Sequence, residues 1–169
     1  MRNKLFLIFL VFILTHNISF GQDQTKRFGI VLMEDFTSQP LNYGFSLWIN
    51  KSTSIELIGG FESMDIEDNS GTKFNIGVGG LYHFGIKKLL PFAGARFLFS
   101  GLTISDKSYS DILLAIVFGA EYFFSEWISL SGEFQFNYIE TDSEFSPGGY
   151  AANAKIYKTG RFLVLRFYL

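Results

Sequence analysis

One segment, between Ile128 and Tyr138, limits what this chain can fold into more than any other part of it. Its residues alternate between two faces, which is the period of a β-strand whose faces meet different environments. One face carries Ile128, Leu130, Gly132, Phe134, Phe136 and Tyr138, and the other carries Ser129, Ser131, Glu133, Gln135 and Asn137. The bulky face is apolar and the polar face is nearly uncharged, whereas a soluble strand would direct Lys and Glu outward. The pattern predicts a strand of a transmembrane β-barrel, with aromatic residues towards lipid and small polar residues towards a narrow lumen.

The N-terminal segment has the features of a secretory signal peptide. Two basic residues precede an apolar run at 5–14, and small residues occupy the two positions that a signal peptidase reads. We expect cleavage before Gln22, because an apolar run of this length is too short to cross a bilayer as a helix. This divides the chain into a signal peptide at 1–21 and one barrel domain at 22–169. The chain has no Cys, so neither disulfides nor a lipid anchor on a cysteine is expected.

Eight segments of period-two alternation, separated by turn-forming residues, follow the predicted signal peptide. They are Lys26–Glu34, Asn42–Asn50, Ile55–Met64, Lys73–Phe84, Leu90–Ser100, Asp111–Phe124, Trp127–Glu140 and Gly160–Leu169. Most of them reach the length that a tilted strand needs to span a bilayer, and no segment after the leader is apolar for long enough to span it as a helix. The sequence therefore predicts an all-β fold, an eight-stranded antiparallel up-and-down transmembrane barrel.

The connections between these segments differ in length. Short connections are expected at Lys51–Ser54 and Ser125–Glu126, and a slightly longer one at Gly85–Leu89. The connections that alternate with them hold DIEDNSGT, GLTISDKSYS and the long Thr141–Thr159, although the first of them, around Phe36–Leu41, is brief. Outer-membrane barrels place short turns in the periplasm and longer loops outside the cell, so this order predicts both termini on the periplasmic side.

Alternation places a set of charged residues on the inward face of the strands. They are Arg27, Glu56, Glu62, Arg96, Glu121, Glu133 and Arg166. A charge buried in a narrow barrel needs a partner, since an isolated buried charge is very costly. We interpret the set as a salt-bridge network that plugs the barrel, with Arg96 and Arg166 paired to Glu121 and Glu133. A pore lining or gate is the alternative, which eight strands disfavour because they leave little room for water.

Other candidate chemistry is weaker. The predicted mature chain has one His, His83, near the periplasmic end of its strand, so an outer-leaflet enzyme would lack a base and no catalytic residue is assigned. The DIEDNSG loop lacks the Gly and the closing acid of an EF-hand, so no metal or cofactor site is assigned. Its acidic residues can instead meet divalent cations that bridge lipopolysaccharide. A formal net charge of −2 gives no indication of nucleic-acid binding.

A soluble barrel of the lipocalin kind is the alternative fold, since it also has eight strands and binds an apolar ligand inside. It would direct the apolar face inward and cover its exterior with charge. The face opposite the Phe residues is too rich in Gly and too poor in Lys to serve as a solvated exterior. The aromatic residues near the strand ends then correspond to the girdles that anchor barrels in a bilayer.

Three segments, LPFAGARF, GEFQFNY and the last strand GRFLVLRFYL, add to this strand pattern. With them, the whole of 22–169 resembles the small eight-stranded outer-membrane barrels of the OmpA/OmpX type in Gram-negative bacteria. The resemblance implies contact with outer-membrane lipid and lipopolysaccharide, and with the barrel-assembly machinery and periplasmic chaperones during biogenesis. It also implies a C-terminal assembly signal, formed by the outward-facing Leu163, Leu165, Phe167 and Leu169. Leu169 stands where members of this group usually end in an aromatic residue.

The resemblance specifies architecture rather than activity, because one fold hosts many functions. We expect a non-enzymatic protein with a structural or surface-interaction role through its extracellular loops, chiefly Thr141–Thr159. A narrow channel for small solutes or ions is the first alternative. An outer-leaflet lipid-modifying enzyme is the second.

Overall fold

The computed structural model describes residues 28–35, 42–66, 69–84, 88–104, 107–141 and 153–169. The regular elements in these residues are β1 (Phe28–Asp35), β2 (Asn42–Trp48), β3 (Thr53–Ile66), β4 (Asn69–His83), β5 (Leu89–Ile104), β6 (Lys107–Phe123), β7 (Ile128–Thr141) and β8 (Lys155–Tyr168). Within this part of the chain, no helix is long and apolar enough to cross a membrane. The predicted signal peptide, Arg27 and the first connection lie outside the described residues.

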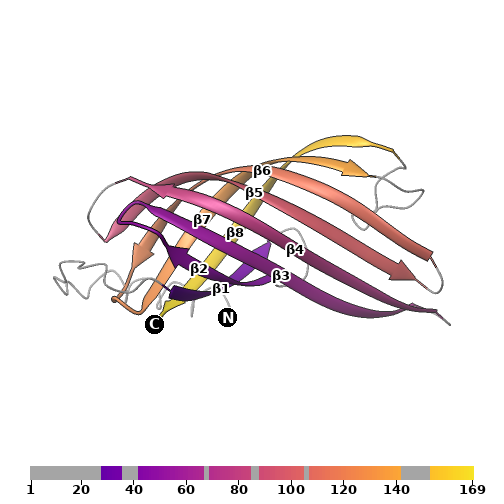
Figure 1. Ribbon diagram of the computed structural model, residues 1–169, viewed down its shortest axis with the longest axis horizontal. Helices are drawn as coiled ribbons and strands as arrows, with labels where there is room; N and C mark the ends of the chain where they lie inside the picture. Colours follow the sequence, from indigo (N-terminus) through magenta and orange to yellow (C-terminus); the bar gives the residue numbers. More distant parts are fainter. Residues whose placement is uncertain (1–27, 36–41, 67–68, 85–87, 105–106, 142–152) are drawn as a thin grey trace, which may run out of the picture.

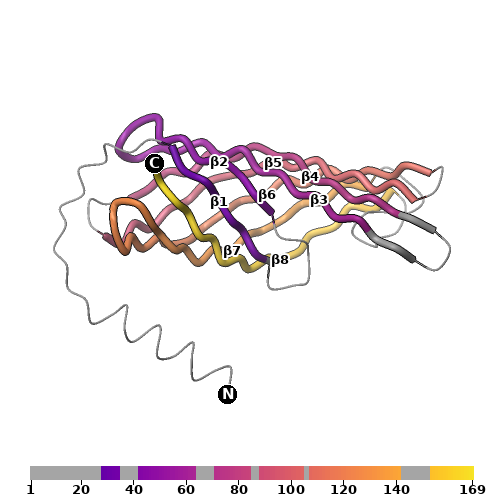
Figure 2. The backbone as a smooth tube through the Cα atoms, turned by 90° about the horizontal axis from the view of Figure 1, so that it is seen from below, coloured from indigo at the N-terminus to yellow at the C-terminus, as the bar shows by residue number. Residues whose placement is uncertain are grey.

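Each strand pairs antiparallel with the next one along the chain, and β1 pairs with β8, so the sheet closes into a barrel. Figure 1 shows the strands wound obliquely around this barrel, and Figure 2 shows β1 and β8 side by side after a quarter turn. The predicted eight-stranded antiparallel up-and-down barrel is thereby confirmed. We call the end that holds the turns Ile49–Ser52 and Phe124–Trp127, together with the C-terminus, the short-turn end.

The register sets the tilt of the strands and decides which inward residues meet. A line of paired residues that starts at Gly29 runs through Ser46, Glu56, Gly79, Arg96, Ala115 and Asn137 and reaches Lys158 in β8. Gly29 itself pairs with Tyr168, ten residues further along β8 than Lys158. An offset of this size in an eight-stranded barrel corresponds to a tilt of roughly 40°, which leaves an interior only wide enough for side chains.

At the opposite end, several strands run further than the sequence predicted. The ladder between β3 and β4 continues to the pair Ile66 and Asn69, and that between β5 and β6 continues to Ile104 and Lys107. The predicted loops DIEDNSGT and GLTISDKSYS are therefore mostly strand, and β8 begins at Lys155, inside the predicted loop Thr141–Thr159. The prediction ended each strand where apolar alternation ended, but backbone pairing needs no apolar face. We call this end the long-hairpin end.

The outer wall of the barrel is apolar and the inner wall is mixed. Large apolar side chains on all eight strands are exposed on the outside, among them Phe45, Leu57, Ile76, Val78, Ile116, Phe134 and Phe136. Side chains of opposite parity are buried inside, including Val31, Met33 and Trp48, which interrupt the polar pattern of the inward face. A soluble barrel has polar residues outside and apolar residues inside. This barrel has the reverse distribution, which fits a barrel surrounded by lipid.

Aromatic pairs lie at both margins of the apolar outer wall. At the short-turn end, the rings of Tyr82 and Phe84 lie 5.0 Å apart, and those of Tyr122 and Phe124 lie 5.1 Å apart. Towards the long-hairpin end, Tyr138 of β7 and Tyr157 of β8 face each other with ring centroids 5.4 Å apart. Tyr side chains of this kind mark the two membrane–water interfaces of a barrel, so these pairs bound the apolar belt.

Candidate functional site

The interior of the barrel is filled in layers, and the layer nearest the short-turn end is aromatic. Trp48, Leu90, Phe123 and Tyr168 form one buried cluster, in which the rings of Phe123 and Tyr168 stack at 5.5 Å. The imidazole of His83 packs on the indole of Trp48, with ring centroids 4.3 Å apart. This layer forms a floor of large rings beneath the charged residues.

Above this floor, Glu56 of β3 joins two arginines from opposite sides of the barrel. Its Oε2 atom accepts hydrogen bonds from Nε and Nη2 of Arg96 at 3.0 and 2.6 Å. Its Oε1 atom accepts hydrogen bonds from Nε and Nη2 of Arg166 at 3.2 and 2.7 Å. In each pair two guanidinium nitrogens donate to one carboxylate oxygen, and hydrogen bonds between ionised groups are about twice as strong as neutral ones.

Glu133 of β7 completes a four-residue ring with the same two arginines. Its carboxylate accepts from Nη1 of Arg96 and, at 3.0 Å, from Nη2 of Arg96. Its Oε1 atom also accepts from Nη2 of Arg166 at 3.2 Å. The remaining Nη1 of Arg166 donates to the hydroxyl of Ser131 at 2.6 Å. Each arginine thus contacts both Glu56 and Glu133.

Glu121 of β6 is the centre of a second group of hydrogen bonds, which lies nearer the aromatic floor. It accepts hydrogen bonds from the hydroxyl of Tyr168 at 2.8 Å and from the hydroxyl of Ser129. Nε2 of His83 donates to it at 3.1 Å, and Nη1 of Arg166 lies 3.7 Å away. We call Glu56, Arg96, Glu121, Glu133 and Arg166 the lumen charge cluster. Arg166 links its two centres.

Burial makes the pairing within this cluster energetically decisive. All five residues of the lumen charge cluster are at most 5% exposed. Removing a charged group from water costs several kcal/mol per ion, and only close partners with good geometry repay it. Because every carboxylate in the cluster has several donors, the cluster is a rigid crosslink between β3, β5, β6, β7 and β8 rather than a set of charges open to solvent.

A glycine makes room for the cluster. Gly79 lies between Glu56 and Arg96 in the paired line across β3, β4 and β5. A Cβ atom at this position would lie 2.8 Å from Cγ of Arg96, closer than such contacts allow. The arginine stem therefore lies over the backbone of β4, and this position needs a residue without a side chain.

Apolar and amide side chains fill the rest of the lumen around the cluster. One group is Val31, Met33, Ile58 and Val164, and a second is Leu81, Phe92, Ala115 and Val117, in which the ring of Phe92 lies 5.3 Å from that of His83. Further along, Nδ2 of Asn75 donates to Oδ1 of Asn42 at 3.1 Å. The lumen charge cluster is thus enclosed by packed side chains on both sides.

The structure brings together five of the six residues assigned to the lumen network from the sequence, and the sixth, Arg27, lies outside the described residues. The expected pairing of the arginines with Glu121 and Glu133 omitted Glu56, which contacts both of them. It also omitted Ser129, Tyr168 and His83, which donate to Glu121, and Ser131, which accepts from Arg166. Their inward direction was readable from the alternation of β4, β7 and β8, but their partners were not. Glu62 is half-buried further along β3, where it pairs across the ladder with Lys73.

The remaining sequence assignments concern catalysis, metal binding and the C-terminus. His83 is 2% exposed and lies at the short-turn end, remote from the long-hairpin end. Among the described residues, no group of three or more His, Asp or Glu side chains is arranged to hold a metal ion. The four residues of the expected C-terminal signal share the outward face of the last strand, where Phe167 and Leu169 are exposed.

The fold is shared with solved barrel structures. Neisserial surface protein A is 15% identical over 84% of this chain and 93% of its own, with a TM-score of 0.56. The N-terminal β-barrel domain of OprF from Pseudomonas aeruginosa is 15% identical over 85% and 96%, with a TM-score of 0.51. A major outer membrane protein from Thermus thermophilus is 11% identical over 86% and 100%, also with a TM-score of 0.51.

No protein-family model and no curated protein sequence matches the chain. At identities of 11–15%, the structural likeness establishes the fold alone. The predicted resemblance to the small eight-stranded outer-membrane barrels is confirmed at that level.

Proposed function

We propose that this chain is a non-enzymatic protein of a Gram-negative outer membrane, with a structural or surface-interaction role carried by its long-hairpin end. The observation that carries this proposal is the lumen charge cluster, which fills the barrel with buried ion pairs and leaves the function to surfaces outside the lumen. A cleaved signal peptide at 1–21 and insertion by the barrel-assembly machinery, with periplasmic chaperones, belong to the same proposal. The C-terminal signal for that insertion is the outward face formed by Leu163, Leu165, Phe167 and Leu169.

The long-hairpin end supports a role at the cell surface. The pairing of β2 with β3 ends at Tyr43 and Gly59, so no described residue pairs with β3 on that side from Gly60 to Ile66. Among the described residues, the pairing of β6 with β7 runs only as far as Asp111 and Thr141. Figure 1 shows β3 to β6 extending together beyond the rest of the barrel. A sheet that projects in this way presents strand edges, to which a partner can add a strand.

The orientation of the barrel is tested by epitope insertion. We expect a short epitope inserted after Ile66 to bind antibody on intact cells, because the β3–β4 hairpin would lie outside the cell. An epitope inserted after Ser125, in a turn at the short-turn end, should bind antibody only after the cells are permeabilised. The reverse result would contradict the assignment of the long-hairpin end to the outside.

The closed lumen is tested by conductance. We expect the refolded barrel to give no regular single-channel steps in a planar lipid bilayer, because ion pairs and packed rings fill its cross-section. Protein that has been heat-denatured before addition is the matched control. Regular steps whose ion selectivity changes in Glu133→Gln would contradict the closed lumen and support the channel.

One observation favours the alternative of a narrow channel. Among the described residues, Ser46, Asn75 and Asn137 each have a buried side-chain oxygen without a hydrogen-bond partner. Buried polar atoms of this kind are usually satisfied by water, so the lumen beside and beyond the charge cluster is polar enough in places to hold water. The enzyme alternative has less support, because His83 is buried at the short-turn end and the outer leaflet lies at the other.

A further inference from the structure

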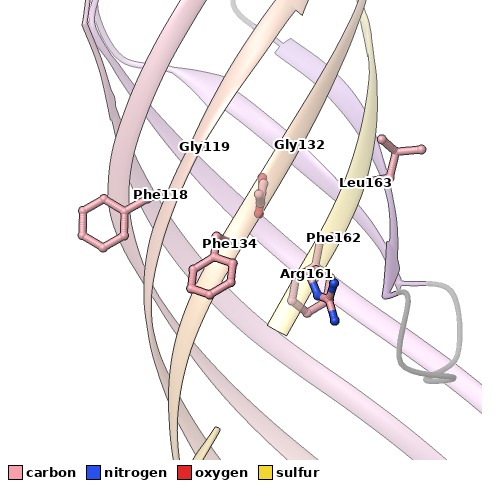
Figure 3. A pocket seen from close by; sticks show the side chains of 8 residues that line it. Phe118, Gly119, Gly132, Phe134, Arg161, Phe162 and Leu163 are labelled. Carbon is pink, nitrogen blue, oxygen red and sulfur yellow. The ribbon is translucent and has the colours of Figure 1, made fainter. Parts of the chain in front are cut away.

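A groove runs along the outer wall of the barrel where β7 lacks a side chain. Gly132 faces outward, and a Cβ atom built on it would meet nothing within 4 Å. The groove is flanked by the rings of Phe118 and Phe134, which are exposed, and by Leu163 of β8. Figure 3 shows both rings on the outer side of β6 and β7, with the position of Gly132 open between them and β8.

A positively charged side chain, that of Arg161, lies at the edge of this apolar groove. Arg161 of β8 pairs with Phe134 across the ladder, is exposed, and belongs to the residues that line the groove. Its outward neighbours along β8 are Leu163 and Thr159, so it interrupts the apolar belt. Among the described residues, none forms a hydrogen bond or an ion pair with Arg161. Glu34 of β1 lies diagonally across from it, since Glu34 pairs with Leu163, yet no ion pair joins the two.

The depth of Arg161 defines which part of a lipid it can reach. Tyr157 belongs to the aromatic pair that marks the interface at the long-hairpin end. It lies on the same strand as Arg161, four residues closer to that end. Four residues on a strand tilted by roughly 40° rise about 10 Å, so the backbone of Arg161 lies within the hydrocarbon region of the outer leaflet. Arginine in this position extends its stem along apolar surface and brings the guanidinium towards the headgroups.

From this geometry we infer a lipid site whose occupant is lipid A, the phosphorylated and acylated anchor of lipopolysaccharide. One acyl chain lies in the groove over Gly132, between Phe118 and Phe134, and the guanidinium of Arg161 binds a phosphate above it. The charge is complementary, because an otherwise unpartnered cation in hydrocarbon gains most from an anion, and guanidinium binds phosphate through two parallel hydrogen bonds. The inference rests on the proposed outer-membrane location, since the site opens to the outer leaflet.

The experiment measures how much lipid A remains on the barrel in native mass spectrometry, after refolding in mixed micelles of lipid A and detergent. Removing the charge-assisted contact in Arg161→Ala should lower the retained fraction roughly tenfold. Lys155→Ala is the matched control, because Lys155 is an exposed cation on the same strand beyond the aromatic pair, and it should retain lipid A as the wild type does.

The groove itself is tested with a pair of glycine substitutions. Gly132→Leu should fill the groove and lower retention of lipid A with Arg161 intact. Gly80→Leu, on another part of the outer wall, should leave the retention of lipid A unchanged, although a Cβ atom there also meets nothing within 4 Å. Neither substitution enters the core, so the boiled and unboiled gel mobilities should match those of the wild type for both.

Several results would overturn the inference. Retention that is unchanged in both Arg161→Ala and Gly132→Leu excludes this site. Equal retention of phosphatidylglycerol and lipid A by the wild type excludes the choice of lipid A. A dimer mass that disappears in Arg161→Ala means that Arg161 makes a contact between copies and does not bind lipid. A barrel that refolds but lacks lipid A contradicts only the lipid site, whereas failure to form any barrel in a bilayer contradicts the proposed function as well.

Discussion

Replacing Glu56 by alanine is expected to lower the free energy of unfolding by about 3–5 kcal/mol, the cost of breaking a buried ion pair by removing one partner. Glu56 accepts four hydrogen bonds from Arg96 and Arg166. Without it, the two buried guanidinium groups are left with Glu133, Glu121 and the accepting hydroxyl of Ser131. The strands that these arginines join lie on different sides of the barrel, so the loss affects the closure of the whole sheet.

The measurement is urea unfolding of the barrel in lipid vesicles, followed by the mobility of unboiled samples on a gel. Glu62→Ala is the matched control, because Glu62 is a half-buried glutamate further along the same strand, and its loss should change stability little. Replacing all five residues of the lumen charge cluster together by apolar residues of similar size should cost less than Glu56→Ala, since no charge of the cluster remains unpaired. A change below about 1 kcal/mol in Glu56→Ala would contradict the role given to the cluster.

An arginine on the outer wall gives the second large effect. Ile116 is 56% exposed at the middle of β6, where it pairs with Ala95 and Phe136. In a bilayer, Ile116→Arg should lower the free energy of unfolding by about 2–4 kcal/mol, because the charge would lie near the midplane of the hydrocarbon. The same unfolding assay in vesicles measures it.

Leu89→Arg is the matched control for that substitution. Leu89 is 55% exposed, almost the same as Ile116, but it is the first residue of β5 and lies at the short-turn end. Near the interface, a new arginine should cost only about 0–1 kcal/mol. Two equally small effects would mean that water surrounds the barrel at both positions, and the lipid-facing outer wall would then be wrong.

The strands and their faces were predictable because the evidence for them is local. Ile128–Tyr138 alternates in its own sequence, and the inward direction of Ser129 or Glu133 follows from a neighbour two positions away. The extension of the hairpins was not predictable in the same way. Residues such as Thr103 and Ser108 have no apolar partner face, and only their pairing with each other across the ladder makes them strand.

The composition of the lumen cluster was predictable, but its connections were not. Alternation identified Glu56, Arg96 and Arg166 as inward residues one by one. Their contact depends on the stagger of the closed sheet, which brings β8 beside β1 with an offset of ten residues. Glu56 and Arg166 are 110 residues apart in sequence, and no local pattern measures that offset. The role of Gly79 as space for the stem of Arg96 depends on the same register.

The sequence by itself determined that this protein is a barrel with an apolar exterior, because a period of two fixes both the strand and the environment of each face. The tertiary structure decided which charges share a carboxylate, how far the hairpins extend, and that Arg161 stands above an open groove at Gly132. The physical reason is that facing direction is a property of one strand. Contact between strands depends on register and closure, which the whole sheet sets together.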